Sequence, residues 1–517
     1  MRRFLLGGLV IVVAGALALS GCPRPGAPAQ PAQDLVIAMG VEPESLDPIR
    51  MSSSPAATVS RHVTETLIYL DVDGTLRPGL AESWDVSADN LVWTLRLRRG
   101  VEFHDGTPFD AEAAKFNLER FLNPDNRAPF RFLIARIIRV EAADGHTLRL
   151  HLDAPFAPLL SHLSHAFIGM VSPASVRALP ADGVVEAPVG TGPFIFDSWA
   201  RGEQIVLRRN PDFWGTAPVI ETVTFRFVPE DASRLVMLET GEAHAIMRVP
   251  PKDVPRLQGD PEIQVVKEDS VRVIYIGFNT QVPPFNDRRV RQALNYAIDK
   301  QAIVDTILAG AGSVSTAPIV PAVFGYHTVG PYPFDPARAR QLLAEAGFPQ
   351  GFRATMHHPT GRYMMDVTIV ESIQSMLRDV GVELELVTME WAAYLAFLRV
   401  PPAEAKHQMF MLGWGCVTLD ADYGIYPLLH SSQWPPAGWG VSYFKSDLAD
   451  GLMDQARITP DRAQREALYR DALTAIWEDA PWIFLHNEVQ INAVRANVQG
   501  LIHHPLENIF AWDARIE

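Results

Sequence analysis

Arg362 is the residue of this chain best suited to hold a charged small molecule. It lies in residues 359–363, Pro-Thr-Gly-Arg-Tyr, directly before a predicted helix. A guanidinium group binds a carboxylate through two parallel hydrogen bonds, and the start of a helix adds a favourable dipole for an anion. We therefore predict that Arg362 binds a ligand carboxylate, with Tyr363 beside it in the site. The alternative is an ordinary surface arginine.

Aromatic residues of the C-terminal third are candidates for a wall of the same site, because aromatic rings supply a large contact area at low cost in conformational entropy. The alternative is that each ring packs in the hydrophobic core. The residues are Trp414, Tyr423, Trp434, Trp439 and Tyr443.

Catalytic motifs are absent from the sequence. It contains no Gly-x-Ser-x-Gly, no phosphate-binding Gly-x-x-x-x-Gly-Lys-Ser/Thr, no His-Glu-x-x-His and no Cys-x-x-Cys. Close histidine pairs could bind a metal, but surface or hydrogen-bonded histidines are the more common case; the pairs are His162 with His165, His357 with His358, and His503 with His504. The sequence predicts no enzymatic activity, no cofactor and no metal site. An exported hydrolase or a metal- or haem-handling lipoprotein is the alternative.

The elements that must position these residues alternate between strands and helices. Alternating apolar residues predict strands at 92–97, 147–152 and 223–228, and a short apolar run predicts one near 35–40. Capping residues predict helices that begin at Asp110, at Asp335 and at Thr459–Pro460, and one that runs from Asp287 without a break to Gly310. A further helix over 366–381 leads into a strand at 382–387, which is typical of an α/β layer.

The N-terminal residues predict that the protein is exported from the cytoplasm. Arg2 and Arg3 precede an apolar run over 4–19, which is shorter than the roughly 20 residues that span a membrane. Residues 1–21 are therefore predicted to be a signal peptide. The sequence Leu-Ser-Gly-Cys at 19–22 resembles the lipobox of bacterial lipoproteins, which implies a lipid anchor on Cys22 and a Pro-rich tether over 22–33. An ordinary cleaved signal with a chance cysteine is the alternative.

Composition limits the possible partners. The 517 residues predict two or three lobes, and 48% hydrophobic residues provide a large core. A net charge of −15 argues against a nucleic-acid partner, because phosphate binding needs a basic face. The two cysteines are Cys22 and Cys416. If Cys22 carries lipid, no disulfide forms within the chain, and Cys416 is predicted to be a buried, unreactive thiol.

Several segments resemble the large solute-binding proteins of the peptide, nickel and opine ABC importers, known as family 5. They follow the order of that family along the chain, and the glutathione-binding and dipeptide-binding members are the most similar. The segments are LRPGLAESW at 76–84, RLRRGVEFHDGTPF at 96–109, GTGPF at 190–194, NPDFW at 210–214 and RVRQALNYAI at 289–298.

The resemblance implies an α/β fold like that of periplasmic binding proteins, with two lobes joined by hinge crossovers and an extra domain inserted in the first lobe. Lobe one would comprise 34–61, 185–268 and 485–517, the added domain 62–184, and lobe two 269–484. The hinges would lie near 267–272 and 485–489. Ligand would lie between the two lobes, and closure around it would present the protein to a membrane permease.

The resemblance also narrows the ligand site. Dipeptide-binding members carry an aspartate three residues after the tryptophan of a Gly-Trp pair, where this chain has Val417. Asp420 or Asp422 would then have to bind a ligand amine, while Trp434 lies in an element closer to that of the glutathione binders. The implied function is a monomeric, lipid-anchored, extracytoplasmic receptor that passes a dipeptide, oligopeptide or glutathione to an ABC permease.

Overall fold

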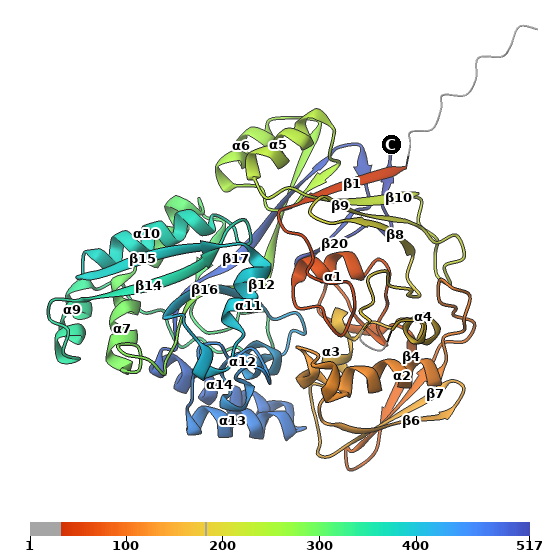
Figure 1. Cartoon of the computed structure of the whole chain (residues 1–517), viewed down its shortest axis with the longest axis horizontal. Helices are drawn as coiled ribbons and strands as arrows, with labels where there is room; N and C mark the ends of the chain where they lie inside the picture. Colours follow the sequence, from red (N-terminus) through yellow and green to blue (C-terminus); the bar gives the residue numbers. More distant parts are fainter. Residues whose placement is uncertain (1–32, 181–182) are drawn as a thin grey trace, which may run out of the picture. The chain divides into compact units, whose positions relative to one another are not determined.

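The computed structural model describes residues 33–180 and 183–517. The predicted signal peptide, the tether up to residue 32 and the predicted lipid-bearing Cys22 lie outside the described residues. Within them, helices surround a large sheet that mixes parallel and antiparallel strands, so the predicted α/β class is confirmed (Figure 1).

The large sheet joins strands from both ends of the chain. β1 pairs in parallel with β10, β14 pairs in parallel with β15, and β12 pairs antiparallel with both β16 and β17. The strand order is β15 (Val382–Met389), β14 (Phe352–Pro359), β16 (Met409–Gly415), β12 (Ile263–Phe278), β17 (Trp482–Arg495), β11 (Ala245–Ile246), β1 (Asp34–Met39), β10 (Thr222–Phe227), β9 (Gln204–Arg209) and β8 (Phe194–Ala200), with β13 (Gly312–Val314) paired to β17.

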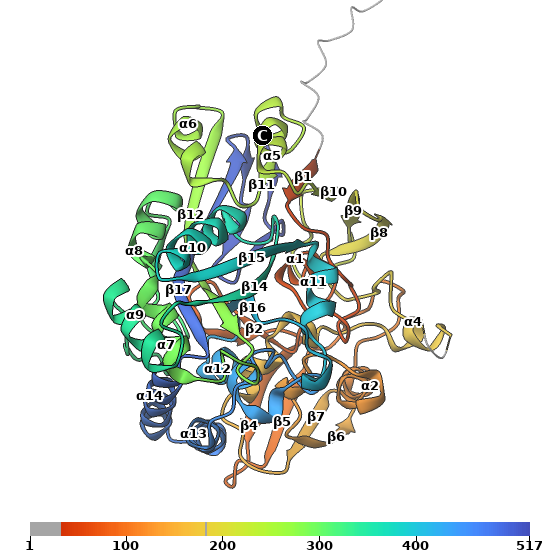
Figure 2. The same cartoon turned by 60° about the vertical axis from the view of Figure 1, so that its left-hand side comes forward.

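Two long strands, β12 and β17, form the middle of this sheet and run side by side in both views (Figures 1 and 2). Their pairing shifts register between Asp269 and Val273 and again between Ile274 and Tyr275. Beyond the shifts, Trp482 of β17 stacks on Tyr275 of β12 with ring centroids 3.8 Å apart, and both side chains are buried. The two strands are therefore packed tightly after the shifts and paired irregularly at them.

A second sheet of four antiparallel strands is formed by residues 81–152 (orange in Figures 1 and 2). The predicted strands at 92–97 and 147–152 are confirmed here as β5, in which Leu95 and Leu97 are buried, and β7, in which Leu148, Leu150 and Leu152 are buried. The order is β4 (Ala81–Val86), β5 (Val92–Leu97), β7 (Thr147–Leu152) and β6 (Ile137–Asp144); two-stranded pairs are β2 (Ile68–Leu70) with β3 (Leu76–Pro78), β19 (Ile502–His504) with β20 (Asn508–Phe510), and β18 (Val498–Gln499) with β21 (Arg515–Ile516).

The helices are short to moderate in length. The α-helices are α1 (Ser54–Ser60), α2 (Ala111–Leu122), α3 (Leu159–Leu163), α4 (Pro173–Arg177), α5 (Asp231–Thr240), α6 (Val254–Gln258), α7 (Arg288–Ala297), α8 (Lys300–Ala302), α9 (Pro336–Glu345), α10 (Asp366–Arg378), α11 (Trp391–Leu398), α12 (Ala421–Leu429), α13 (Asp447–Ile458) and α14 (Arg462–Asp479). Short helical turns are η1 (Pro124–Asn126), η2 (Arg131–Leu133), η3 (Ala166–Ile168), η4 (Pro251–Asp253), η6 (Pro402–Glu404) and η7 (Ser431–Gln433).

Most predicted helix starts are confirmed by their caps. Asp110 accepts a hydrogen bond from the backbone N–H of Ala113, and Asp335 accepts one from that of Arg338. Such caps satisfy backbone donors that have no partner inside the helix. The last long helix begins at Arg462 rather than at Thr459–Pro460, because Asp461 provides its cap.

The predicted unbroken helix from Asp287 to Gly310 is wrong. Helix α7 ends at Ala297, where Ile298 takes an extended conformation (φ −103°, ψ 121°). Asp299 then caps the short α8 by accepting from the backbone N–H of Ala302, and a π-helical turn, η5 (Ile303–Ile307), follows. The apolar spacing continues through the break, so hydrophobic periodicity alone could not reveal it.

The break buries a lysine. Lys300 is 4% exposed and its ammonium donates to the backbone carbonyl of Asn295 at 2.5 Å. Burial lowers the pKa of Lys300 from 10.5 to about 7, and neighbouring Asp299 offsets only part of this effect. The unfolded chain therefore binds more protons than the folded chain between about pH 7 and pH 10, so this lysine makes stability rise with pH in that window.

We expect Lys300→Met to remove this rise. The variant should gain most stability over the parent at pH 6, where the parent buries a charged ammonium, and the gain should shrink as pH approaches 10. Urea unfolding at pH 6, 7.5 and 9 measures the difference, with the exposed Lys252→Met as control. A difference that does not change with pH would contradict the assignment.

Candidate binding site

A cavity lies between segments that are far apart in the sequence. One group of lining residues comes from residues 52–61 together with 506 and 508, a second from residues 130–167, and a third from residues 362–439. The lining comprises Ser52, Ser53, Ser54, Ala57, Arg61, Phe130, His165, Ala166, Phe167, Arg272, Arg362, Trp391, Leu395, Leu412, Gly413, Trp414, Gly415, Val417, Tyr423, Leu428, Trp439, Leu506 and Asn508.

Arg362 contributes the most unusual group of this cavity. Its side chain is 2% exposed, and within the described part of the chain its Nε and Nη1 atoms have no hydrogen-bond acceptor. The guanidinium lies over the rings of Tyr363 and Trp391, 4.8 and 5.0 Å from their centroids. Burial and the nearby cations Arg272 and Arg248 lower the pKa of Arg362 to about 10. The group remains a cation at neutral pH, with hydrogen-bonding capacity unused.

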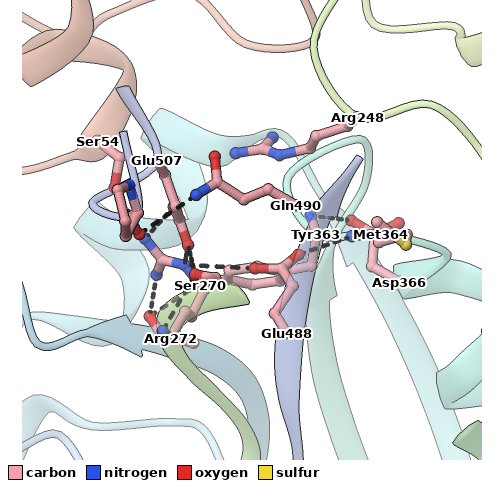
Figure 3. A network of polar contacts seen from close by, with 12 residues as sticks. Ser54, Arg248, Ser270, Arg272, Tyr363, Met364, Asp366, Glu488, Gln490 and Glu507 are labelled. Carbon is pink, nitrogen blue, oxygen red and sulfur yellow. Dashed lines mark hydrogen bonds and ion pairs between the residues drawn. The ribbon is translucent and has the colours of Figure 1, made fainter. Parts of the chain in front are cut away.

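The loop before α10 fixes the position of Arg362. The carboxylate of Asp366 accepts from the backbone N–H of Arg362 at 2.9 Å. It also accepts from the backbone N–H of Tyr363 at 3.1 Å (Figure 3). The chain therefore turns tightly around the first residue of the helix. The predicted position of Arg362 directly before a helix is confirmed.

Arg272 belongs to an ion pair on the border of the cavity. Its guanidinium donates two hydrogen bonds to the Glu507 carboxylate, one of them from Nη2 to Oε2 at 2.5 Å. It also donates to Ser54 Oγ at 2.8 Å (Figure 3), and to the backbone carbonyl of Gly413 at 2.8 Å. Arg272 thus connects α1 with β16 through charged hydrogen bonds, and its charge is neutralised inside the protein.

The pKa values of Glu488 and Glu507 shift in opposite directions, because Arg272 forms its ion pair with Glu507. Burial raises the pKa of Glu507, but attraction and hydrogen bonds from Arg272 outweigh burial, so its pKa lies below the ordinary value. Burial and repulsion from Glu507 raise the pKa of Glu488, whose Oε2 lies 3.5 Å from Arg272 Nε. Neither glutamate lines the cavity.

Aromatic rings make up one wall. Trp414 and Tyr423 lie with ring centroids 5.1 Å apart, and the Trp414 indole donates to the backbone carbonyl of Tyr423 at 2.9 Å. Phe130 stacks against Trp414 at 6.0 Å, and Trp439 lies 5.5 Å from Phe130. Of the aromatic residues singled out in the sequence, Trp414, Tyr423 and Trp439 line the cavity.

Asp420 and Asp422 lie outside the lining, in ion pairs of their own. Asp420 accepts two hydrogen bonds from Arg465 at 2.7 and 2.6 Å and also caps α12. Asp422 lies 2.9 Å from Arg457 Nε and 3.4 Å from His162 Nε2. Both carboxylates are therefore neutralised by arginines of α13 and α14.

Three other residues singled out in the sequence also lie behind the lining. Tyr363 is buried and its ring supports the guanidinium of Arg362. The Trp434 indole donates to the carbonyl of Phe444 at 2.9 Å, and the Tyr443 hydroxyl donates to the carbonyl of Val400 at 2.8 Å. The structure thus brings Arg362, with Tyr363 behind it, close to part of the aromatic set.

Sequence reasoning missed several lining residues. Arg61, Ser54 and Asn508 are common polar types without a local motif, and Trp391 was not singled out. Arg61 is 7% exposed, and its Nη2 donates to the carbonyl of Ser164 at 2.5 Å. Only the tertiary fold brings these residues to the cavity, so no pattern of spacing could have identified them.

Two further features of the described residues are the placement of possible metal ligands and the apolar character of the helices. Within 33–180 and 183–517, no three His, Cys, Asp or Glu side chains are grouped so as to hold a metal ion. Cys416 is buried, its thiol lies 3.1 Å from the carbonyl of Asp420, and burial raises the pKa of the thiol well above its ordinary value. In the same ranges, no helix combines the length and the apolar character needed to cross a bilayer.

Comparison with known proteins identifies the family. The family described as bacterial extracellular solute-binding proteins, family 5 Middle, matches residues 75–436. The glutathione-binding protein GsiB of Pectobacterium atrosepticum is 33% identical over 497 residues, covering 94% of each chain. GsiB of Escherichia coli K12 is 32% identical over 480 residues, covering 91% of this chain and 92% of that protein.

Solved structures give the same result. The periplasmic binding protein DppA of Helicobacter pylori, in complex with the peptide STSA, superposes with a TM-score of 0.86 at 28% identity, covering 94% of this chain and 98% of that chain. The binding protein AgaA of A. tumefaciens R10, in complex with agropinic acid, has a TM-score of 0.85 at 28% identity, covering 94% and 99%. The predicted fold, like that of periplasmic binding proteins, is confirmed, and the chain belongs to family 5 of the bacterial extracellular solute-binding proteins.

Proposed function

We propose that this protein is the substrate-binding component of an ABC importer, and that it captures a short peptide-like solute and delivers it chemically unchanged to a permease. The candidate solutes are a dipeptide, an oligopeptide or glutathione. The observation that carries the proposal is the buried, unpartnered guanidinium of Arg362 in the lining of a cavity. A buried cation without a partner is costly, and a ligand carboxylate would remove that cost.

Closure around the solute is part of this proposal. The proposed lobes are 34–61, 185–268 and 485–517 for lobe one, 62–184 for the added domain, and 269–484 for lobe two. In support, lining residues come from Ser54 and Asn508 on one side and from Arg362 and Trp414 on the other, while Phe130 belongs to the added domain. The proposed hinge at 267–272 coincides with the shifted register of β12 and β17.

The cellular setting is likewise proposed. The family is extracellular by description, and a lipid on Cys22 would hold the protein at the outer face of a membrane, close to its permease. The protein would act as a monomer. Mass spectrometry of the protein purified from membranes would detect a diacylglyceryl modification of Cys22, and Cys22→Ser should release the protein into the soluble fraction.

A ligand screen tests the proposed function. Native mass spectrometry of the purified protein would reveal a co-purified solute, and a thermal-shift panel of free and N-acetylated di-, tri- and tetrapeptides with glutathione would rank ligands. A ligand that binds only the folded state raises the melting temperature with its concentration. We expect a saturable shift with at least one member of the panel. No shift with any member, together with turnover of a peptide, would contradict the proposal.

Trp434 lies behind the cavity lining and can be compared with a tryptophan of the lining. Because its indole donates to Phe444 and does not reach the cavity, Trp434→Phe should cost about 1 kcal/mol of stability through the lost hydrogen bond. Ligand affinity should change less than about twofold, well under the 1.4 kcal/mol of a tenfold change. Trp439→Phe, which alters a lining residue, is the matched variant. Calorimetry with a ligand from the screen measures both, and a large loss in Trp434→Phe would place that residue in the site.

A further inference from the structure

The unsatisfied groups of the cavity are all hydrogen-bond donors. Among the described lining residues, the buried side-chain N or O atoms without a hydrogen-bond partner are nitrogens that carry hydrogen and cannot accept. They are Arg61 Nε, Arg362 Nε, Arg362 Nη1, Trp391 Nε1 and Trp439 Nε1. A ligand that satisfies them must present acceptor atoms.

The hydrogen bonds of nearby polar side chains leave further donors. Ser54 Oγ accepts from Arg272, and this leaves the hydroxyl hydrogen of Ser54 available. Asn508 Oδ1 lies 3.1 Å from the Thr58 hydroxyl, whose single hydrogen can also go to the carbonyl of Ser54 or of Glu507, and the amide NH₂ of Asn508 is available. Ser54 and Asn508 therefore each offer a donor to a ligand.

The hydrogen bond between His165 and Tyr423 also leaves a donor available to a ligand. His165 Nδ1 accepts from the backbone N–H of Phe167, so its proton is assigned to Nε2. That Nε2 then donates to the Tyr423 hydroxyl oxygen at 3.0 Å, and the Tyr423 hydrogen stays available to a ligand. Burial lowers the pKa of His165 well below its ordinary value, so the ring is neutral and this assignment holds at neutral pH.

Acceptors in the lining are neutral. The hydroxyls of Ser52 and Ser53 both donate to Glu44, so their oxygens can still accept a hydrogen bond from an amide N–H. None of the lining residues is Asp or Glu. Carbonyls and hydroxyls can receive an amide hydrogen of the ligand, but they cannot neutralise an ammonium.

Positive charge, in contrast, is in excess. Arg272 is neutralised by Glu507. Within the described chain, neither Arg61 nor Arg362 has a carboxylate within 4.0 Å. The aspartates that the family resemblance suggested for a ligand amine, Asp420 and Asp422, are engaged by other arginines. The Glu44 carboxylate lies behind the lining serines and already accepts their hydrogen bonds. A buried ammonium would therefore have no carboxylate in the lining and would keep much of its desolvation cost next to two cations.

We propose that the solute is an anion with carboxylate and carbonyl acceptors and with no free ammonium group. Its chemical class is an N-acylated or lactam-capped peptide, or another carboxylate whose nitrogen is an amide. The carboxylate would bind Arg362, further acceptors would bind Arg61 and the indoles, and the amide N–H groups would donate to the serine oxygens. This inference rests on the proposed function and narrows its solute, because it favours amine-capped compounds over the free dipeptide, oligopeptide or glutathione in the same cavity.

Matched pairs of probes test the absence of a free ammonium group from the solute, by calorimetry on the purified protein. The pairs are Ala-Phe with N-acetyl-Ala-Phe, and glutathione with N-acetylglutathione; N-acetyl-Ala-Phe amide lacks the carboxylate. We expect each acetylated probe to bind at least tenfold more tightly than its free-amine partner, and the amide to bind at least tenfold more weakly than N-acetyl-Ala-Phe. If a free-amine probe binds as tightly as its acetylated partner, this inference fails and the import function stands. If no probe binds, both fail.

A substitution in the lining provides the converse test. Val417 lines the cavity, and Val417→Asp would supply the missing carboxylate. We expect the variant to reverse the selectivity of the parent, so that the free amine binds at least as tightly as the acetylated probe. Val417→Asn, which has the same shape without charge, is the control and should retain the parent preference. Unchanged selectivity in a folded Val417→Asp protein would overturn the inference.

Discussion

Arg272→Met is expected to lower the free energy of unfolding by about 3–5 kcal/mol, because it leaves the Glu507 carboxylate buried without its partner. The contacts of Arg272 with Ser54 and Gly413 would be lost in the same variant. Urea unfolding of the ligand-free protein measures the change.

The control for this prediction is an exposed ion pair. Arg353 lies 2.7 Å from Glu383, but both side chains are well exposed, so Arg353→Met should cost no more than about 1 kcal/mol. A loss of similar size in the two variants would contradict the special role of the buried pair.

The loss of stability at acid pH should also be different in Arg272→Met. The lowered pKa of Glu507 means that the unfolded chain takes up its proton first as pH falls. Its contribution is therefore present above the ordinary glutamate pKa of about 4.3 and is lost as pH falls toward the folded-state value. In Arg272→Met this part of the acid-induced loss should be absent.

Arg362→Met is expected to weaken binding of a carboxylate ligand at least tenfold, about 1.4 kcal/mol, because the fork of two N–H donors disappears from the cavity. Stability of the ligand-free protein should not fall by more than about 1 kcal/mol, because the substitution removes a buried cation that has no acceptor for Nε and Nη1. Binding and stability are thus expected to separate in this variant.

Two comparisons make the result for Arg362 specific. Arg362→Lys keeps the charge but loses the fork, so its affinity should lie between those of the parent and Arg362→Met. A ligand whose carboxylate is converted to an amide should bind the parent and Arg362→Met with similar affinity. Calorimetry that shows unchanged affinity for the carboxylate ligand would remove Arg362 from the site.

Much of the fold could be predicted from local patterns. The strands at 92–97 and 147–152 alternate because one face of their sheet is buried, and the starts of α2 and α9 follow from the aspartate caps Asp110 and Asp335. The break after Ala297 could not be predicted, because apolar residues continue through it and Asp299 reads as an ordinary helix residue.

The candidate site was only partly accessible from the sequence. Arg362 could be found because a short loop, a helix start and an arginine occur together, and Trp414 because it belongs to a cluster of aromatic residues. The partner of Asp420 could not be predicted, because Arg465 lies 45 residues further along the chain on another helix. Arg61 lacked any local signal, since only the tertiary fold makes it a buried donor.

The shifted register between β12 and β17 bears on how fast a solute can escape. Between Asp269 and Val273 the direct ladder is interrupted, and the backbone of Val271 pairs with Pro505 and Cys416 instead. If the chain bends at this proposed hinge, few hydrogen bonds between β12 and β17 would break there, whereas the Arg272 side chain at the same point is hydrogen-bonded to Glu507, Ser54 and Gly413. Under the proposed function, the dwell time of the solute and the thermal stability of the protein would therefore depend on the same few atoms, and an engineered biosensor that needs rapid exchange would trade one against the other.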